Sequence, residues 1–473
     1  MTRHSLALRR LSLLTAIHFT VDMLSGTLPG FLPALRERYS LSLVTGTVLL
    51  TICSFSSNGV QLWAGTLRKS AKRPLLVQLG LVLSCAVCFA GLAPVSGPTL
   101  FLSCLVLVLG VGVAFAHPEG LRGICAIPEN SVSPAVATSL FMLAGFSGYA
   151  TGPLLGGLLV QSFGFSGLYF LLIPAAALLW FFHKARVKLA LDGDDARKQE
   201  RRPTQKTPAA ASGPAIPFNR IFLLAVLINS GCGIMQGLLP SYLADYGYSL
   251  GFGGLSGTLF GLGAGIGAFT TSFIIKRVPV IRCLKIEIAA GIPVLMLYLI
   301  LAGNPWAAFL AAPAGILVGA GFPQLVVLAR TAPGRLALGP RMGMIVGGTW
   351  GIAGITLLLA GFVGKYLTLQ AAMFLAPLCF AAALVMLFIL GNGKRRSASV
   401  PAQLREGRLS CSLGVISLPL LSVTMRCNAV PIPYIIFLSF PMLTRLISMT
   451  NSSGLLVVLI VATKSLSISS TSP

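Results

Sequence analysis

Charged residues, and acidic ones above all, are scarce in this chain. Only 11 of its 473 residues are Asp or Glu, and all charged residues together make up 10% of the sequence. A water-soluble domain is about 25% charged. A surface this poor in charge excludes an ordinary soluble protein, so lipid is the expected solvent for most of the chain. The 35 Lys and Arg residues fall between long apolar runs, where they set topology and meet anionic lipid, and we expect no nucleic-acid binding.

Motifs for hydrolysis and for cofactor binding are also missing. We find no P-loop, no G-x-S-x-G and no run with metal-ligand spacing. The glycine-rich stretch at 261–267 lies inside an apolar run without a βαβ context, which argues against a dinucleotide loop. Cys85 and Cys88 form a C-x-x-C inside another apolar run, with no His or acid nearby, and are interpreted as apolar filler. We therefore expect no enzyme activity, no cofactor and no metal.

Long apolar runs are what the chain has in abundance. A helix needs about 20 apolar residues to cross roughly 30 Å of hydrocarbon, and a backbone in lipid must satisfy its own hydrogen bonds, so such runs form helices. The sequence thus predicts an all-α membrane protein with twelve transmembrane helices. The predicted spans are about 11–34, 43–64, 75–95, 98–117, 134–160, 165–183, 219–244, 254–275, 284–302, 306–328, 342–363 and 368–390.

The basic residues test this count, because they alternate between the two sides of the membrane. If the N-terminus is cytoplasmic, only Arg36, Arg38 and Lys365 fall outside. The other basic clusters fall inside, at 3–10, 68–73, 184–218, 276–285, 330–341 and 394–396. This pattern follows the positive-inside rule and predicts a multi-pass membrane protein with a cytoplasmic N-terminus. The first run, from about Leu11 to Leu35, is too long for a signal peptide and is interpreted as an uncleaved helix.

The two halves of the chain repeat each other. The run that begins at His18 matches the run that begins at Asn229, at an offset of 211, and Pro118 in the fourth span corresponds to Pro323 in the tenth. Six spans per unit make the repeat parallel, a device of transporters with a substrate site between the halves. We predict an N-terminal half at 1–183, a cytoplasmic linker at 184–218, a C-terminal half at 219–390 and a separate tail at 391–473.

Asp22 stands near the middle of the first span, where an ionised acid costs about 2.5–3.5 kcal/mol on insertion scales. Such residues usually face a cavity and carry protons or substrate. His18 precedes Asp22 by one helical turn and projects from the same face, and histidine titrates near neutral pH. We predict that the pair serves in proton coupling. The alternative is a neutral, hydrogen-bonded Asp22 that only fixes helix packing.

The fifth span contains "GYATGPLLGG", whose glycines would let a neighbouring helix approach closely. This stretch resembles the signature of drug/proton antiporters in the major facilitator superfamily. Its residues are Gly148, Gly152, Pro153, Gly156 and Gly157. Ordinary small-residue packing is the alternative interpretation of this motif.

The first and fourth spans resemble those of the fosmidomycin-resistance group of the same superfamily. His18 and Asp22 match the first-helix motif, although Val21 replaces the usual Asn. The match in the fourth span consists of His117, Pro118, Glu119 and Arg122. The resemblance covers about residues 11–390. It departs from the superfamily pattern at Lys69, which stands where an acid usually helps to latch the inward side.

The resemblance implies a major facilitator fold with twelve helices in two parallel six-helix repeats, and antiport of small drugs, such as fosmidomycin-like compounds, against protons. It assigns a gate or coupling role to His117, Glu119 and Arg122, although Glu119 and Arg122 could instead form a simple ion pair. The implied phenotype is drug efflux and antibiotic resistance.

Uncharged polar and aromatic residues of the second half are the candidates for the substrate cavity. They are Asn229, Gln236, Gln324 and Trp350. Because the acids within the predicted spans cluster in the first half, we expect proton coupling there. An importer of an organic anion or sugar, or a membrane receptor or scaffold that has kept a transporter fold, are the alternatives. The expected partners are a small substrate, protons and lipid, and we expect a monomer.

Overall fold

Helices account for all the regular structure that can be described. The computed structural model describes residues 3–64, 73–128, 131–187, 189, 216–275, 277–333, 336 and 338–397. Every regular element in these ranges is a helix, so the predicted all-α class is confirmed. Lys69, most of the predicted linker and the predicted tail beyond residue 397 lie outside the described residues.

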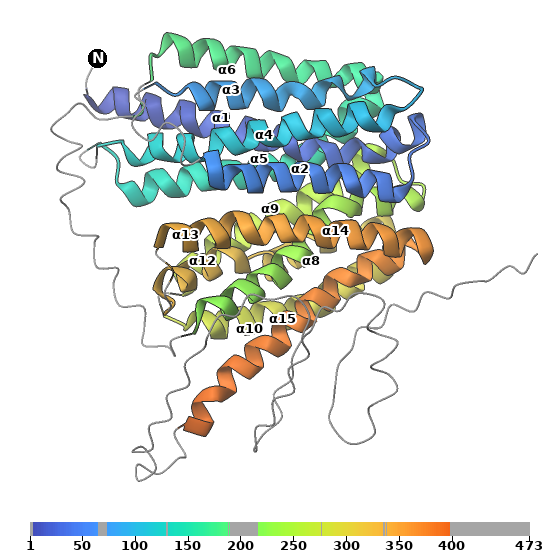
Figure 1. Ribbon diagram of the computed structural model, residues 1–473. Coiled ribbons are helices and arrows are strands. Elements are labelled where there is room, and N and C mark those ends of the chain that lie inside the picture. Colours follow the sequence, from blue (N-terminus) through green and yellow to red (C-terminus); the bar gives the residue numbers. More distant parts are fainter. Residues whose placement is uncertain are drawn as a thin grey trace, which may run out of the picture. The chain divides into compact units, whose positions relative to one another are not determined.

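The first half contains six crossings. In chain order they are α1 (Arg3–Arg38), α2 (Leu43–Ala64), α3 (Leu75–Ser84) with the 3₁₀ helix η1 (Cys85–Leu92), α4 (Pro98–Cys125), α5 (Pro134–Phe163), and η2 (Gly164–Leu171) with α6 (Leu172–Lys184). In Figure 1 these helices, coloured blue to green, run alongside one another.

The second half also contains six crossings. They are α8 (Phe218–Asp245), α9 (Leu250–Ile274), α10 (Val280–Ile300), η3 (Pro305–Leu310) with α11 (Ala311–Val318) and α12 (Gly321–Thr331), α13 (Leu338–Gly343) with the π-helical turn η4 (Met344–Gly348) and α14 (Thr349–Tyr366), and α15 (Leu369–Ser397). They carry the light green to orange colours in Figure 1.

The helix count depends on one long stretch. By length and composition the described residues contain 11 apolar helical stretches able to cross a membrane, and one of these, Val136–Lys184, has 49 residues. At about 1.5 Å per residue that stretch would be ~74 Å long, more than twice the roughly 30 Å of hydrocarbon. The chain turns at Gly164, whose φ of 63° favours glycine, and η2 then packs against η1. Two crossings therefore replace one, and the predicted twelve-helix fold is confirmed.

Glycines bring α1 and α5 into backbone contact. A Cβ added at Gly26 would overlap the backbone of Tyr149, one at Gly152 would overlap Gly26, and one at Gly30 would overlap Pro153. In lipid, small residues at such positions allow the close approach that drives helix association. This contact fixes the register of α1 against α5.

The glycines of the fifth-span motif do not all face the same neighbour. Gly148, Gly152 and Gly156 lie against α1, where an added Cβ would overlap the backbone of Phe19, Gly26 and Thr27. Gly157 instead lies against Leu250 of α9, in the other half. The motif thus packs within the first half and across to the second.

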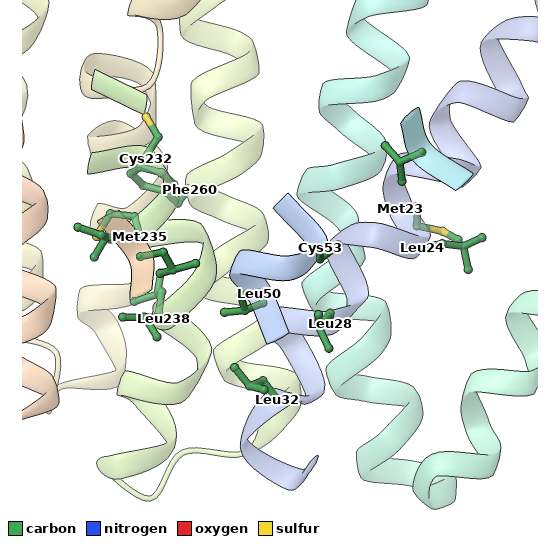
Figure 2. Close-up of a cluster of buried hydrophobic side chains, with 14 of the residues drawn as sticks. Met23, Leu24, Leu28, Leu32, Leu50, Cys53, Cys232, Met235, Leu238 and Phe260 are labelled. Carbon is green, nitrogen blue, oxygen red and sulfur yellow. The ribbon is translucent and has the colours of Figure 1, made fainter. Parts of the chain in front are cut away.

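The C-terminal half of α5 packs directly against α9 of the second half. There Gln161 Oε1 accepts a hydrogen bond of 2.8 Å from the backbone N–H of Gly251, and Gly254 packs against the backbone of Pro153. Buried apolar side chains of α1, α2, α8 and α9 continue this core. Figure 2 shows part of it, with Leu28 near Leu50 and with Leu238 on α8.

Candidate functional site

A cavity of about 250 Å³ lies between the two halves. It is lined by α1, α2, α4 and α5 of the first half, and by α8, α9, α12 and α14 of the second. The third and sixth crossings of each half contribute none of its described lining residues. The parallel repeat therefore supplies equivalent helices from each half to one shared site.

Asp22 lies on the wall of this cavity between two histidines. Its Oδ2 is 3.2 Å from His18 Nε2, one turn earlier on α1. Its Oδ1 is 3.2 Å from His117 Nε2 on α4. The His18 and His117 rings meet edge to face, with centroids 4.6 Å apart. We call these three side chains the Asp22 cluster.

The second nitrogen of each histidine contacts a backbone carbonyl. His18 Nδ1 lies 2.7 Å from the carbonyl oxygen of Phe141 on α5, and His117 Nδ1 lies 2.7 Å from that of Val113. Because a carbonyl oxygen only accepts, both Nδ1 atoms must carry a proton and donate. Both Nε2 atoms are thereby directed at Asp22. The Phe141 ring also stacks on His18, at a centroid distance of 3.9 Å.

Gly145 on α5 makes room for the Asp22 cluster. A Cβ at this position would lie 2.6 Å from Asp22 Oδ2 and 2.6 Å from His18 Nε2. Sequence reasoning missed both Gly145 and Phe141. Gly145 lies three residues before Gly148 of the fifth-span motif, and that proximity was the only available signal.

The charge of Asp22 has no permanent counter-ion nearby. Within the described part of the chain, none of the residues that line the cavity is Lys or Arg. A buried carboxylate must be compensated, so its partners are the two titratable histidines. Two imidazoles and a carboxylate whose ligand atoms lie within 4.8 Å of one another also form a donor set that suits a divalent transition metal. Each nitrogen, however, faces its own carboxylate oxygen at a hydrogen-bonding distance.

Glu119 and Arg122 do not join His117 at the cavity. Glu119 is buried against α3, where its Oε2 accepts a hydrogen bond of 2.9 Å from the N–H of Val77 in the first turn. Its Oε1 lies 3.4 Å from Arg122. A carboxylate at a helix N-terminus is favourable, because it satisfies free N–H groups and the helix dipole. The structure therefore separates the three residues that the sequence grouped together.

The second half contains a buried acid that the sequence reasoning overlooked. Glu287 on α10 accepts hydrogen bonds from the Thr271 hydroxyl of α9 and the Gln324 amide of α12. The expectation that membrane acids cluster in the first half is therefore wrong. Glu287 follows Lys285 closely in sequence, and so resembled the charge of a loop end.

Gln324 is not among the described residues that line the cavity, which corrects its predicted position. It is 2% exposed, and its side chain is turned toward Glu287. Pro323, its neighbour, does line the cavity. Adjacent residues of a helix point about 100° apart, and the rotation of α12 turns Pro323 to the cavity and the Gln324 side chain toward Glu287.

Asn229, Gln236 and Trp350 do line the cavity. Asn229 is held by a hydrogen bond of 2.8 Å from its Nδ2 to Thr349 Oγ1. The Trp350 ring meets Phe322 edge to face, with centroids 5.9 Å apart. The π-helical turn η4 directly precedes Thr349 and Trp350, and such turns often re-aim residues at functional sites. The second half thus offers an amide and aromatic wall.

Hydroxyl groups of α2 bridge this wall to the first half. Thr51 donates a hydrogen bond of 2.8 Å to the carbonyl oxygen of Gly354, and Ser54 donates one of 3.2 Å to that of Trp350. Sequence reasoning did not single out either residue, since an isolated Ser or Thr in a membrane helix more often bonds within its own helix.

Comparisons with known proteins agree with the fold. The family model for the Major Facilitator Superfamily matches residues 131–339, a range that excludes the Asp22 cluster. A bacterial homologue of the human lysosomal transporter Spinster superposes with a TM-score of 0.61 at 15% identity, over 81% of this chain and 95% of that one. The nucleoside transporter NupG superposes with a TM-score of 0.60 at 13% identity, over 81% and 99%.

Two curated relatives are similar in sequence. The uncharacterized MFS-type transporter YfnC of Bacillus subtilis (strain 168) is 26% identical over 184 residues, 38% of this chain and 44% of that protein. The multidrug resistance protein MdtG of Escherichia coli (strain 55989 / EAEC) is 23% identical over 206 residues, 44% of this chain and 48% of that protein. The chain thus spans less than half the length of either relative. Together these matches make the chain similar to bacterial membrane transporters of the major facilitator superfamily.

Proposed function

We propose that the protein is a proton-coupled exporter of small drugs. The observation that carries this proposal is the Asp22 cluster on the wall of a cavity that both halves line. Because Asp22 is paired only with titratable groups, the total charge of the cluster changes whenever one of its members gains or loses a proton. A cavity shared by two packed bundles can change its accessible side when one bundle rocks against the other.

The proposed cycle uses this change of charge. Asp22 and His18 release protons when substrate enters the cavity and bind protons again after substrate leaves on the other side. Gln236 and Trp350 contact the substrate body, while Asn229 holds the wall against Thr349. The proton gradient then drives export, since each inward step of protons is tied to an outward step of substrate.

Drug export is favoured by two further observations. MdtG is a multidrug resistance protein, and the first and fourth spans resemble the fosmidomycin-resistance group in residues that include His18, Asp22 and His117. Fosmidomycin-like compounds are therefore the proposed substrates. The basic clusters favour a cytoplasmic N-terminus in a bacterial inner membrane. With that orientation the close contacts around Gln161 lie on the outer side.

We assign Glu119 and Arg122 to the gate indirectly. Glu119 fixes the start of α3 against α4, and α4 carries His117. A movement of α3 therefore reaches the Asp22 cluster through α4, which makes Glu119 a positioning residue. In this proposal Glu119 and Arg122 keep a gate or coupling role, which they exert indirectly by positioning α4 and therefore His117.

The test is expression in an efflux-deficient bacterium, scored against a drug panel that includes fosmidomycin. We expect resistance from the wild type and none from Asp22→Asn at equal protein levels. His183→Gln on the exposed end of α6 is the matched control and should behave as wild type. Full resistance from Asp22→Asn would refute the coupling role, and no resistance to any compound from the wild type would refute drug export.

Direction is tested separately, because an importer of an organic anion or sugar would use the same cavity. Export predicts drug uptake into inverted vesicles under an imposed pH gradient, and none into right-side-out vesicles. The reverse result would make the protein an importer. Flux in neither preparation, with any of the panel compounds, would favour a receptor or scaffold.

A further inference from the structure

The hydrogen bonds of the Asp22 cluster fix the number of protons it contains. Both Nδ1 protons are committed to the carbonyl oxygens of Phe141 and Val113. Each Nε2 faces a carboxylate oxygen at 3.2 Å. Without a proton in such a contact, a nitrogen lone pair would face an oxygen lone pair, which is repulsive. Two such contacts require two protons beyond those on Nδ1.

The charge of the cluster follows from this count. Two imidazolium groups around one carboxylate, or one imidazolium beside a protonated carboxyl and a neutral imidazole, both sum to a charge of about +1. Loss of one proton leaves the cluster neutral, with one contact unbonded. Loss of both leaves an uncompensated carboxylate in a cavity whose described lining contains no Lys or Arg.

The neighbouring titratable groups do not alter this count. Cys53 on α2, Tyr149 on α5 and Cys232 on α8 line the same cavity, and thiol and phenol groups are ordinarily neutral near pH 7. On α4, Glu119 is engaged with α3 and Arg122. Neither Glu119 nor Arg122 is among the described residues that line the cavity.

We infer that the Asp22 cluster holds two exchangeable protons, and that His117 carries one of them. His117 is thereby a proton carrier of the site, a more specific role than the gate or coupling role that the sequence analysis assigned to it. The His117 proton can leave from Nε2 directly into the cavity, since that side chain is 20% exposed. The proton shared with the buried His18 can leave through Asp22, which is 13% exposed. The use of both protons in transport rests on the function proposed above, whereas the count itself does not.

The four histidines of the chain make the count measurable. Full-length protein in lipid nanodiscs, labelled with ¹⁵N-histidine, reports the protonation of each imidazole nitrogen near neutral pH. Infrared difference spectra against Asp22→Asn report whether Asp22 is protonated. His4 and His183 are exposed and serve as internal references. We expect a total of two protons on the two Nε2 atoms and Asp22.

His117→Gln sharpens the test, because the Gln amide can still donate to Asp22 without carrying a proton. We expect the total to fall from two to one, while His183→Gln leaves it at two. A total of one or none in the wild type, or a total unchanged by His117→Gln, would overturn the inference. So would histidine signals that shift on adding EDTA, because a metal would then occupy the Nε2 atoms.

The two proposals fail in different ways. If Asp22→Asn leaves coupled resistance intact while the count is two, the proposed transport role is wrong and the count stands. If the count is one and Asp22→Asn still abolishes resistance, the coupling role stands and only the two-proton inference is wrong.

Discussion

The two halves have the same arrangement of helices, but they line the cavity with chemically different side chains. At the position where α1 carries His18, the repeat places Asn229 on α8, and at the same offset Asp22 corresponds to Gly233. The first half thus lines the cavity with a carboxylate and two histidines, and the second with two amides, aromatic rings and small residues. Equivalent positions of the two halves therefore carry a titratable pair in the first half, at His18 and Asp22, and an amide and a glycine in the second, at Asn229 and Gly233.

A second difference concerns the tie between the third and fourth crossings of each half. The prolines that correspond in the repeat precede Glu119 in the first half and Gln324 in the second. Glu119 binds the backbone of α3, whereas Gln324 binds the side chain of Glu287 on α10. Each of these contacts contains one acid. It lies on the fourth crossing in the first half (Glu119) and on the third crossing in the second half (Glu287).

The largest effect is expected from a variant that disrupts the close packing of α1 against α5. Gly152→Val would push a branched side chain into the backbone of Gly26 and Met23, and overpacking costs about 1–3 kcal/mol or more. We expect loss of folded protein, measured as the monodisperse yield after extraction. Gly351→Ala in the second half meets nothing within 4 Å, so its yield should match the wild type. Equal yields for both variants would contradict the packing argument.

The next largest effect is expected from a variant that displaces only the Asp22 cluster. Gly145→Ala adds a Cβ 2.6 Å from Asp22 Oδ2, which forces the Asp22 cluster apart while α5 stays helical. We expect normal yield but drug resistance reduced at least about tenfold, since a displaced proton donor costs more than about 1.4 kcal/mol in function. Wild-type resistance in Gly145→Ala would show that the cluster tolerates displacement. Gly348→Ala, whose added Cβ would lie no closer than 3.5 Å to a neighbour and which does not line the cavity, is the control in the second half and should keep wild-type resistance.

A smaller effect is expected from removing the carboxylate of Glu287. Glu287→Leu leaves the Thr271 hydroxyl and the Gln324 amide without their acceptor, at about 1–3 kcal/mol for a buried unsatisfied group. We expect a lower midpoint of thermal unfolding in detergent. Glu287→Gln keeps an acceptor oxygen and should recover part of the loss. A midpoint unchanged in Glu287→Leu would refute the structural role of this tie.

The smallest effect concerns the bridge between the halves. Thr51→Val removes the hydrogen bond to Gly354, and such bonds in membranes contribute about 0.6 kcal/mol. We expect a two- to threefold shift toward the state in which α2 and α14 separate, measured by spin-label distances between the halves. Thr45→Val, at a half-buried position at the start of α2 where Thr45 forms local hydrogen bonds with Ser42, should leave the distance distribution unchanged. An unchanged distribution in Thr51→Val would mean that the bridge is present in both states.

The pairing of His18 with Asp22 was predictable, because both lie on one helix and helical geometry alone places i and i+4 side by side. The position of His117 opposite them was not, since it depends on how α4 packs beside α1. Gly145 was equally hidden: many glycines occur in these helices, and only the packed structure distinguishes the one that faces a carboxylate.

The same limit explains the errors. Gln324 and Pro323 are adjacent in sequence, and only the rotation of α12 decides that Pro323 faces the cavity while Gln324 faces Glu287. Glu119 and Arg122 looked like partners of His117 because they follow it closely, but residues two and five positions further along a helix are rotated from it by about 200° and about 140°.

The sequence by itself determined the twelve crossings and the parallel repeat. Lipid forces every apolar run of sufficient length into a helix, and this requirement is local to each run. Only the tertiary structure decided which polar side chains meet. Contacts between helices depend on rotation and register, and glycine contacts such as Gly26 with Gly152 set these from residues far apart in the chain.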